Sequence, residues 1–404
     1  MIDTSRSMLY HLDNLNTESK RVSYQMGSGK VIDKGSDDAT LYAKLIDFED
    51  SLRVTENLKL QVNQTQALND VSDTNMASIK DALDGIKTDL LQSLNSGMDR
   101  SDKLAIAMNL RGVRDDLYDR VTTDVGGEYI FSGSNSTVPT LEKDNDFDLN
   151  GKIEYKGNGF LREVAVEPGS YRDRGVTGYD VIFYTASKGL AGDSFTFSEN
   201  ERIIDNEGYE WKLNADKTKL QKYDRDGNVF HPLDSNTEIS IDSSTDAEEA
   251  DTTKQSKQAT FTIDALPSVP EGRVFEAKHN YFDDLNMIIN ALEGQSTKLD
   301  GTTGGEIDDE LVRKTLSNGL EQTSNQFDAA NIGHGKLGGR NKVFDTAYEA
   351  LLAKETHYNI LIQENGAADV AKLAMESQAL DMTYQALYST IAKMNEMSLM
   401  NYLK

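Results

Sequence analysis

The last stretch of the chain, Ala367 to Lys404, constrains the fold most, because its apolar residues recur at alternating three- and four-residue steps. This spacing is the a/d seam of a coiled coil. As a helix, Val370 to Leu403 would be about 50 Å long. One apolar stripe on a long helix cannot bury itself, so the helix needs a partner. The seam positions are Val370, Leu373, Ser377, Leu380, Tyr384, Leu387, Ile391 and Met394.

The opposite end of the chain supplies a candidate partner with the same rhythm. Its positions are Met8, Leu12, Leu15, Ser19, Val22 and Met26. The simplest interpretation is that the two termini meet as a helical pair and that everything between them loops outward. Such a terminal pair is expected to become ordered in an assembly, although amphipathic helices usually bury their stripe within their own domain.

Composition excludes several kinds of chemistry and of partner. The 404 residues include no cysteine, which excludes disulfides, thiolate catalysis and Cys-ligated zinc. The formal net charge of −26 would repel phosphate backbones and anionic lipids, so no nucleic acid and no membrane is expected as a partner. The N-terminus lacks the basic, then apolar, then small-residue order of a cleaved signal peptide.

Three helices are predicted before residue 126. The first runs from about Thr4 to Met26 and is stopped by Gly27-Ser28-Gly29. Ser36 is the expected N-cap of the second helix, with Asp37 and Asp38 in its first turn. That helix keeps its stripe from Leu41 to Leu90, but the stripe is polar between Thr55 and Ser72. The third helix begins near Ser101.

At Gly126-Gly127 the pattern changes to short alternating runs, which predict a β-rich segment up to about Val274. Asp226-Gly227 and Glu207-Gly208 are typical of hairpin turns. The polar stretch from Ser240 to Lys257 predicts an exposed loop. The strand-like runs are Tyr129 to Phe131, Ile153 to Tyr155, Tyr179 to Tyr184, Phe195 to Phe197, Tyr209 to Leu213 and Phe261 to Ile263.

Helices are predicted to resume at Val274, with Phe275, Phe282, Leu285 and Ile289 on one face. A loop follows from Asp300 to Gly305. A long helix then runs from near Ile307 to about Glu364. It crosses four glycines, which cost about 1 kcal/mol each relative to alanine and so indicate a bend or a close backbone approach. These glycines are Gly333, Gly335, Gly338 and Gly339.

The predicted fold class is therefore α+β: a long helical coiled coil or bundle built from both termini, with a β-rich inserted outer domain. The expected domain segments are an N-terminal helix (1–40), two halves of a helical domain (41–139 and 275–366), the β-rich insertion (140–274) and a C-terminal helix (367–404).

The sequence offers no convincing catalytic, cofactor or metal site, so we expect a protein that is not an enzyme. Gly27 to Lys30 lacks the other parts of a phosphate-binding loop, and a helix-ending loop is the better interpretation. The five histidines have no metal-ligand spacing. The aspartates that come closest to a calcium loop, without its distal glutamate, are Asp144, Asp146 and Asp148, and Asp224 and Asp226.

Several short motifs resemble the flagellin superfamily, which forms the axial shaft of bacterial flagella. The head residues Ser7 to Tyr10, the loop Met26 to Val31 and the motif Ser36-Asp37-Asp38 are similar to its N-terminal region. Within the superfamily, two further motifs resemble the hook–filament junction family (hook-associated protein 3). The chain departs from the family at Gly35 and Ala39, where proline is usual. The two motifs comprise Tyr129, Phe131 and Gly133, and Asn401, Tyr402 and Leu403.

This resemblance implies a structural, extracellular protein that forms a ring between hook and filament. It implies export without a cleaved signal through the flagellum's own type III apparatus. The implied partners are other copies of the chain, the hook-proximal junction protein, flagellin, and an export chaperone that binds the C-terminal helix. The terminal helices would form the inner core, and their seam residues would be the assembly interface.

Three alternatives stay open at this level. The chain could be a filament-forming flagellin, although the motif at Tyr129 to Gly133 argues against this. It could be a secreted coiled-coil adhesin whose β domain binds glycans, for which the single Trp211 is the only indication. An enzyme in the β insertion is the weakest alternative, because no histidine cluster or metal motif is present.

Overall fold

The computed structural model describes residues 2–95, 97–143, 152–231, 233, 237–248, 254–267 and 273–402. The chain divides into two compact units, one comprising Met1–Leu60 with Tyr348–Lys404 and the other comprising Gln61–Ala347. Two long helices, α2 (Ala39–Ser93) and α5 (Asp309–Gly366), contribute to both units.

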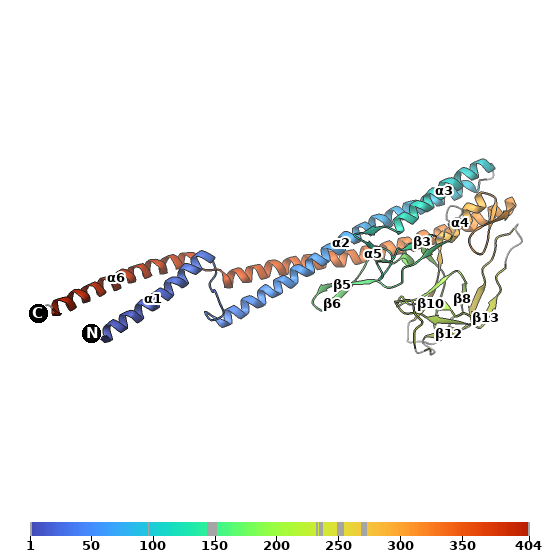
Figure 1. Cartoon of the computed structure of the whole chain (residues 1–404). Coiled ribbons are helices and arrows are strands. Elements are labelled where there is room, and N and C mark those ends of the chain that lie inside the picture. The colour runs from blue at the N-terminus through green and yellow to red at the C-terminus, as the bar shows by residue number, and fades with distance from the viewer. Residues whose placement is uncertain are drawn as a thin grey trace. The chain divides into compact units, whose positions relative to one another are not determined.

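In the first unit, α1 (Ile2–Ser28) and α6 (Val370–Tyr402) lie side by side and run in opposite directions (Figure 1). A short antiparallel backbone bridge joins the loop after α1 to the residues just before α6. The amide of Val31 donates to the carbonyl of Gly366 (2.8 Å), and the amide of Ala368 donates to the carbonyl of Gly29 (2.9 Å). Gly29 has a φ of 70°, a left-handed conformation that glycine allows at the end of a helix.

The predicted cap of the second helix is wrong by two residues. Asp38, not Ser36, accepts hydrogen bonds from the amides of Thr40 (3.0 Å) and Leu41 (2.9 Å). Asp37 lies before the helix, and its carboxylate accepts from the amides of Asp33 and Lys34. The two acidic residues therefore fix the loop and cap the helix, instead of standing in its first turn.

The second unit contains a helical part in which α2 and α5 pack with α3 (Arg100–Val121) and α4 (Tyr281–Leu292). The predicted unbroken stripe of α2 is confirmed, because its apolar positions from residue 76 onward are fully buried. These positions are Met76, Ile79, Leu83, Ile86 and Leu90.

Helix α5 continues through all four glycines, as predicted, but close approach explains only one of them. A Cβ on Gly333 would lie 2.4 Å from the backbone oxygen of Asp180. A Cβ on Gly335, Gly338 or Gly339 would have no atom within 4 Å. The segment around Asp180 is also tied to α5 by the side chain of Lys336, which binds the Asp180 carboxylate at 2.7 Å.

The β-rich part of the second unit is built from antiparallel pairs. A six-stranded sheet has the order β12-β11-β10-β9-β15-β7, and a three-stranded sheet has the order β13-β14-β8. They share one apolar cluster, in which Trp211 and Phe275 are buried. The strands of these sheets are β7 (Phe183–Leu190), β8 (Phe195–Ser198), β9 (Arg202–Asp205), β10 (Glu210–Leu213), β11 (Lys219–Lys222), β12 (Glu238–Ser240), β13 (Ser243–Thr245), β14 (Thr260–Ile263) and β15 (Val274–Asn280).

In the described part of the unit, four two-stranded pairs accompany these sheets. The hairpin of β5 and β6 keeps Val164 and Val166 buried. The pairs are β1 (Asp124–Val125) with β2 (Glu128–Tyr129), β3 (Leu141–Lys143) with β4 (Ile153–Tyr155), β5 (Arg162–Glu167) with β6 (Ser170–Arg174), and β16 (Gln295–Thr297) with β17 (Thr303–Glu306).

The prediction that a helix begins at Val274 is wrong. Residues Val274–Asn280 form β15, which pairs with both β7 and β9, and Phe275 and Ala277 alternate into the core. The helix begins only at Tyr281, where the Asn280 side chain accepts from the amide of Phe282. Phe275 also has a helical spacing with Phe282, so the local sequence pattern did not distinguish a strand from a helix.

Four smaller expectations also need correction. β13 lies inside the predicted loop of Ser240 to Lys257, and β17 begins inside the predicted loop of Asp300 to Gly305. Ile130 and Phe131 follow β2 in a turn, and a 3-10 turn at Gly178–Asp180 precedes β7. The turns at Gly208 (φ 89°) and Gly227 (φ 81°) are confirmed.

The α+β class with helical ends and a β-rich insertion is confirmed. The domain boundaries stay predictions, and Asp144, Asp146 and Asp148 lie outside the described residues. No helix in the described ranges is sufficiently long and apolar to cross a membrane.

Candidate functional site at the paired chain termini

The seam predicted from both termini is largely brought together in the pair of α1 and α6. Val22 and Leu373 are the most deeply buried residues of the pair, with 2% and 5% of their surface exposed. The half-buried seam residues are Met8, Leu12 and Leu15 on α1, and Leu380, Tyr384, Leu387 and Ile391 on α6.

Two predicted seam residues are exposed and not buried in the seam. Met26 is 45% exposed and Val370 is 62% exposed. Near the end of α1 the buried position is Gln25, whose side-chain amide donates to the carbonyl of Val31 in the connecting loop. Val370 is the first residue of α6, where the pair begins. Met394 belongs to α6, but its side chain lies outside what the structure describes.

Polar contacts along the seam fix the register of the two helices. The guanidinium of Arg21 bonds to Glu376 on the partner helix at 3.0 Å, and also contacts Glu18 and Gln25 on its own helix. The Tyr384 hydroxyl donates to Asn16 at 2.8 Å. A one-turn slip would break both cross-helix bonds, so these contacts select one alignment. The apolar rhythm alone did not identify Arg21 or Gln25.

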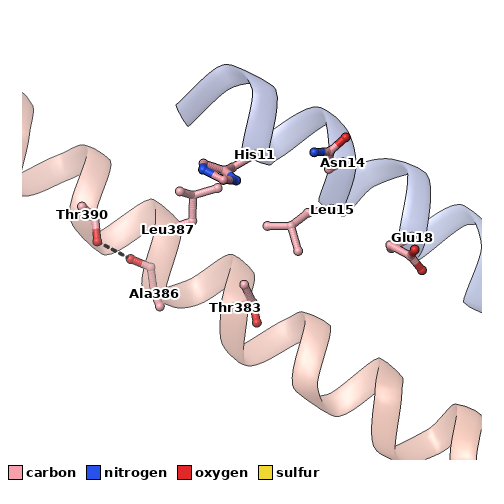
Figure 2. A pocket seen from close by; sticks show the side chains of 8 residues that line it. All are labelled: His11, Asn14, Leu15, Glu18, Thr383, Ala386, Leu387 and Thr390. Atoms are coloured by element: carbon pink, nitrogen blue, oxygen red, sulfur yellow. Dashed lines mark hydrogen bonds between the residues drawn. The ribbon is translucent and has the colours of Figure 1, made fainter. Parts of the chain in front are cut away.

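Toward the chain ends the two helices leave a groove of about 420 Å³ between them. Figure 2 shows Leu15 and Leu387 directed into the space between the helices. The other lining residues are small or polar, so the seam is incompletely filled here. The lining comprises His11, Asn14, Leu15, Glu18, Thr383, Ala386, Leu387 and Thr390.

The outward faces of the pair also carry large apolar side chains. A two-helix pair with large apolar side chains exposed to solvent is typical of a surface that binds other molecules. The exposed residues are Leu9, Tyr10, Met375, Met382 and Tyr388.

The motif around Tyr129 to Gly133 holds a tightly packed turn in the second unit. Phe131 is fully buried, and its carbonyl accepts bonds from the Tyr155 hydroxyl (3.1 Å) and the Gly178 amide (2.8 Å). Gly133 has a φ of 75°, and a Cβ there would lie 2.5 Å from the Asn158 carbonyl oxygen. The amide of Tyr129 donates to the Ser136 carbonyl (2.8 Å). These residues therefore have a structural role, which is to hold the backbone of this turn in its conformation.

Glu128 connects this motif to the β5–β6 hairpin. Its two carboxylate oxygens bind Arg162 (2.5 Å) and Arg174 (2.9 Å). Burial alone would raise the pKa of Glu128, but the two guanidinium groups hold that pKa below its ordinary value. The charged carboxylate therefore joins β2 to both strands of the β5–β6 hairpin.

The remaining motif residues lie at helix ends. Asn401 and Tyr402 are the last residues of α6, and Leu403 lies outside the described residues. Ser36 to Asp38 form the loop and cap described above.

Within the described part of the chain, no three metal-binding side chains come together. Asp224 stabilises a turn: its Oδ1 accepts hydrogen bonds from the amides of Asp226 (2.9 Å) and Asn228 (2.8 Å). His279 lies 3.0 Å from Asp284 and 3.6 Å from Glu201. Burial would lower the pKa of His279, but these carboxylates raise it well above its usual value, as expected for an internal ion pair.

Comparison with known proteins agrees with these features. Residues 4–136 match the family model of the bacterial flagellin N-terminal helical region. None of the curated proteins matches the chain significantly.

Several solved structures are similar at low identity. One described as a flagellar hook-associated protein from Vibrio parahaemolyticus has a TM-score of 0.50 and 12% identity, and the match covers 82% of this chain and 100% of that one. FlgL from Xanthomonas campestris has a TM-score of 0.49 and 16% identity, with 78% and 99% covered. Hook associated protein-3 from Legionella pneumophila has a TM-score of 0.47 and 14% identity, with 80% and 98% covered.

The Vibrio structure shares the fold of this chain along most of its length. Residues 4–136 are in addition similar to the N-terminal helical region of bacterial flagellin, and the shared fold agrees with that similarity.

Proposed function

We propose that this chain is a structural axial protein of the bacterial flagellum, which forms the junction between hook and filament and templates flagellin assembly. The observation that carries the proposal is the paired termini: one seam joins α1 to α6, and large apolar side chains face outward from the same pair. The flagellin-type N-terminal region and the motif at Tyr129 to Gly133 support it.

In this role the terminal pair forms the inner core of a ring built from copies of the chain. The exposed apolar residues of α1 and α6 would be covered by neighbouring copies, by the hook-proximal junction protein on one side and by flagellin on the other. The β-rich part needs no ligand for this role.

Export is the second part of the proposal. The chain would leave the cell through the flagellar type III apparatus without a cleaved signal. The apolar seam of α6 would bind an export chaperone first and α1 later, because both uses need the same face of the helix.

The test is deletion of residues 367–404 in the organism that encodes the chain, followed by electron microscopy. We expect normal hooks without filaments, and flagellin shed into the medium. The control is the full-length chain restored to the same strain, which should restore filaments. Intact filaments and normal swimming in the deletion strain would overturn the proposal.

A filament-forming flagellin is the second candidate, because the matched family model describes the N-terminal region of flagellin itself. Purified flagellin-like chains should polymerise without limit, whereas a junction protein should not. The adhesin alternative rested on Trp211 as a glycan-binding residue. Trp211 is instead buried, and its ring nitrogen donates to Asp205 (3.0 Å), so this indication no longer holds.

A further inference from the structure

Two stretches of the sequence have the Asn-x-Ser/Thr pattern of an N-glycosylation acceptor: Asn63-Gln64-Thr65 and Asn135-Ser136-Thr137. The pattern alone is frequent by chance, so the local structure has to decide whether either one can act. A transferase needs an accessible asparagine amide and an accessible hydroxyl two residues later, on a backbone that can turn away from the protein.

The stretch at Asn63 fails this requirement. It lies inside α2, and Thr65 is only 2% exposed. The Thr65 hydroxyl is committed to the carbonyl of Gln61 at 2.9 Å. A transferase would have to unwind a long packed helix to reach it.

The stretch at Asn135 meets the requirement. It lies in the turn between β2 and β3, and both Asn135 and Thr137 are exposed. The Thr137 hydroxyl donates to the side-chain oxygen of Asn135 at 3.2 Å. Between them, Ser136 is buried, and its hydroxyl accepts from Arg162 at 3.0 Å. The middle residue is therefore anchored while the two reactive side chains face outward.

We propose that Asn135 is a site of N-linked glycosylation, with a sugar supplied as a diphosphate ester. The amide nitrogen Nδ2 attacks the anomeric carbon of the sugar. The new carbon–nitrogen bond forms as the carbon–oxygen bond to the diphosphate breaks, and the diphosphate leaves with the electron pair. The amide proton passes to a base of the transferase. The hydroxyl of Thr137 polarises the carboxamide by donating to its oxygen.

This inference does not depend on the proposed function. It predicts a modification that is confined to one turn and that needs both Asn135 and the hydroxyl of Thr137. The side chains of both residues are exposed, so substituting either should leave the fold intact.

The test is mass spectrometry of the full-length chain purified from its own organism. Trypsin releases residues 121–143, in which Asn135 is the only asparagine, and residues 60–80, which contain Asn63. We expect a sugar mass on Asn135, located by electron-transfer fragmentation, and no sugar on Asn63. Asn135→Gln and Thr137→Val should abolish the mass shift, and Thr137→Ser should retain it.

An unmodified peptide 121–143 would overturn the inference, as would a sugar attached to one of its serines or threonines. A sugar on Asn63 would overturn the structural argument that separates the two stretches. Incubating the unmodified chain with cell fractions identifies the donor: transfer by soluble extract with a nucleoside diphosphate sugar, or by membranes with a lipid-linked one. Transfer by neither fraction would also count against the proposal.

Discussion

Gly133 shows how a single residue of a short motif acts through backbone geometry. Its φ of 75° is unfavourable for any other L residue, and a Cβ would meet the Asn158 carbonyl. We expect Gly133→Ala to lower the free energy of unfolding by more than about 2 kcal/mol, because backbone strain and a steric clash act together. Thermal or urea unfolding measures this.

The matched control is Gly127→Ala, two residues before this motif. Gly127 has a φ of 86°, but a Cβ there would have no atom within 4 Å. This variant should show only the smaller backbone effect, about 1 kcal/mol. Equal losses in the two variants would contradict the role assigned to the contact with Asn158.

Glu128 gives a pH-dependent prediction at the same scale. Its pKa in the folded chain is lowered, so its ion pairs add stability above the unfolded-state pKa of about 4.3 and lose it as the pH falls through the folded-state pKa. Glu128→Gln should therefore lower stability near pH 7 by about 1 kcal/mol. The difference from the parent chain should shrink below about pH 4.

Urea unfolding at a series of pH values checks this, with hydrogen exchange of the β5–β6 amides as a local readout. Glu163→Gln, an exposed position on the same hairpin, is the control and should have little effect at any pH. A Glu128→Gln effect that is constant between pH 3 and pH 7 would contradict the ion-pair assignment.

At the scale of elements, the pair of α1 and α6 depends on one seam. Leu373→Asp would bury a charge against α1, so we expect it to separate the helices and lose their hydrogen-exchange protection. Val370→Asp lies three residues earlier on the same helix but is exposed, and should leave that protection unchanged. Equal protection in both variants would show that Leu373 does not hold the pair together.

The polar seam of α2 carries a prediction about export. Thr55, Thr65 and Ser72 are buried, and each hydroxyl donates only to a carbonyl one turn back in its own helix. Replacing them with valine, valine and alanine should raise stability by about 1–2 kcal/mol in total, because the sites become apolar at nearly constant volume. We expect this stabilised chain to be secreted more slowly, since the proposed export route would require the chain to unfold.

Thr74→Val with Thr88→Val is the control, because those hydroxyls make the same bond but are exposed. The control should be secreted like the parent chain, as measured by immunoblotting of the medium over time. Normal secretion by a demonstrably stabilised triple variant would contradict the link between the polar seam and export.

The elements with long periodic stripes were predictable from sequence, and those that depend on distant neighbours were not. The stripes of α1, α2 and α6 identify these helices because the seam repeats over many turns. β15 was missed because its pairing with β7 and β9 involves strands far away in the chain. Its Phe275 also fits a helical spacing with Phe282, so the local pattern was ambiguous.

The candidate site was predictable to the same degree. Most of the predicted apolar seam residues are buried or half-buried in the pair, whereas Met26 and Val370 are exposed and the side chain of Met394 is not described. Gln25 takes the last buried position of α1 because its amide reaches Val31, and that contact depends on the loop. Asp38 caps α2 instead of Ser36 for a similar reason: both residue types can cap a helix, and only the loop geometry selects between them.

At the scale of the whole molecule, the proposed junction role would place the chain in one short zone of the flagellum. Its termini pair with each other. In the proposed role, other subunits would cover the exposed apolar residues of this pair, and the β-rich part would not take part in that contact. A filament subunit would share much of this architecture, so architecture does not separate the two roles. Position along the organelle does.

The most direct measurement is therefore immunogold electron microscopy of intact flagella, with an antibody raised against the β-rich part of the chain. The junction role predicts gold at one position in each flagellum, at the boundary between hook and filament. Gold along the length of the filament would contradict it and favour a filament-forming flagellin. Flagella without any label, from cells that produce the chain, would contradict it as well.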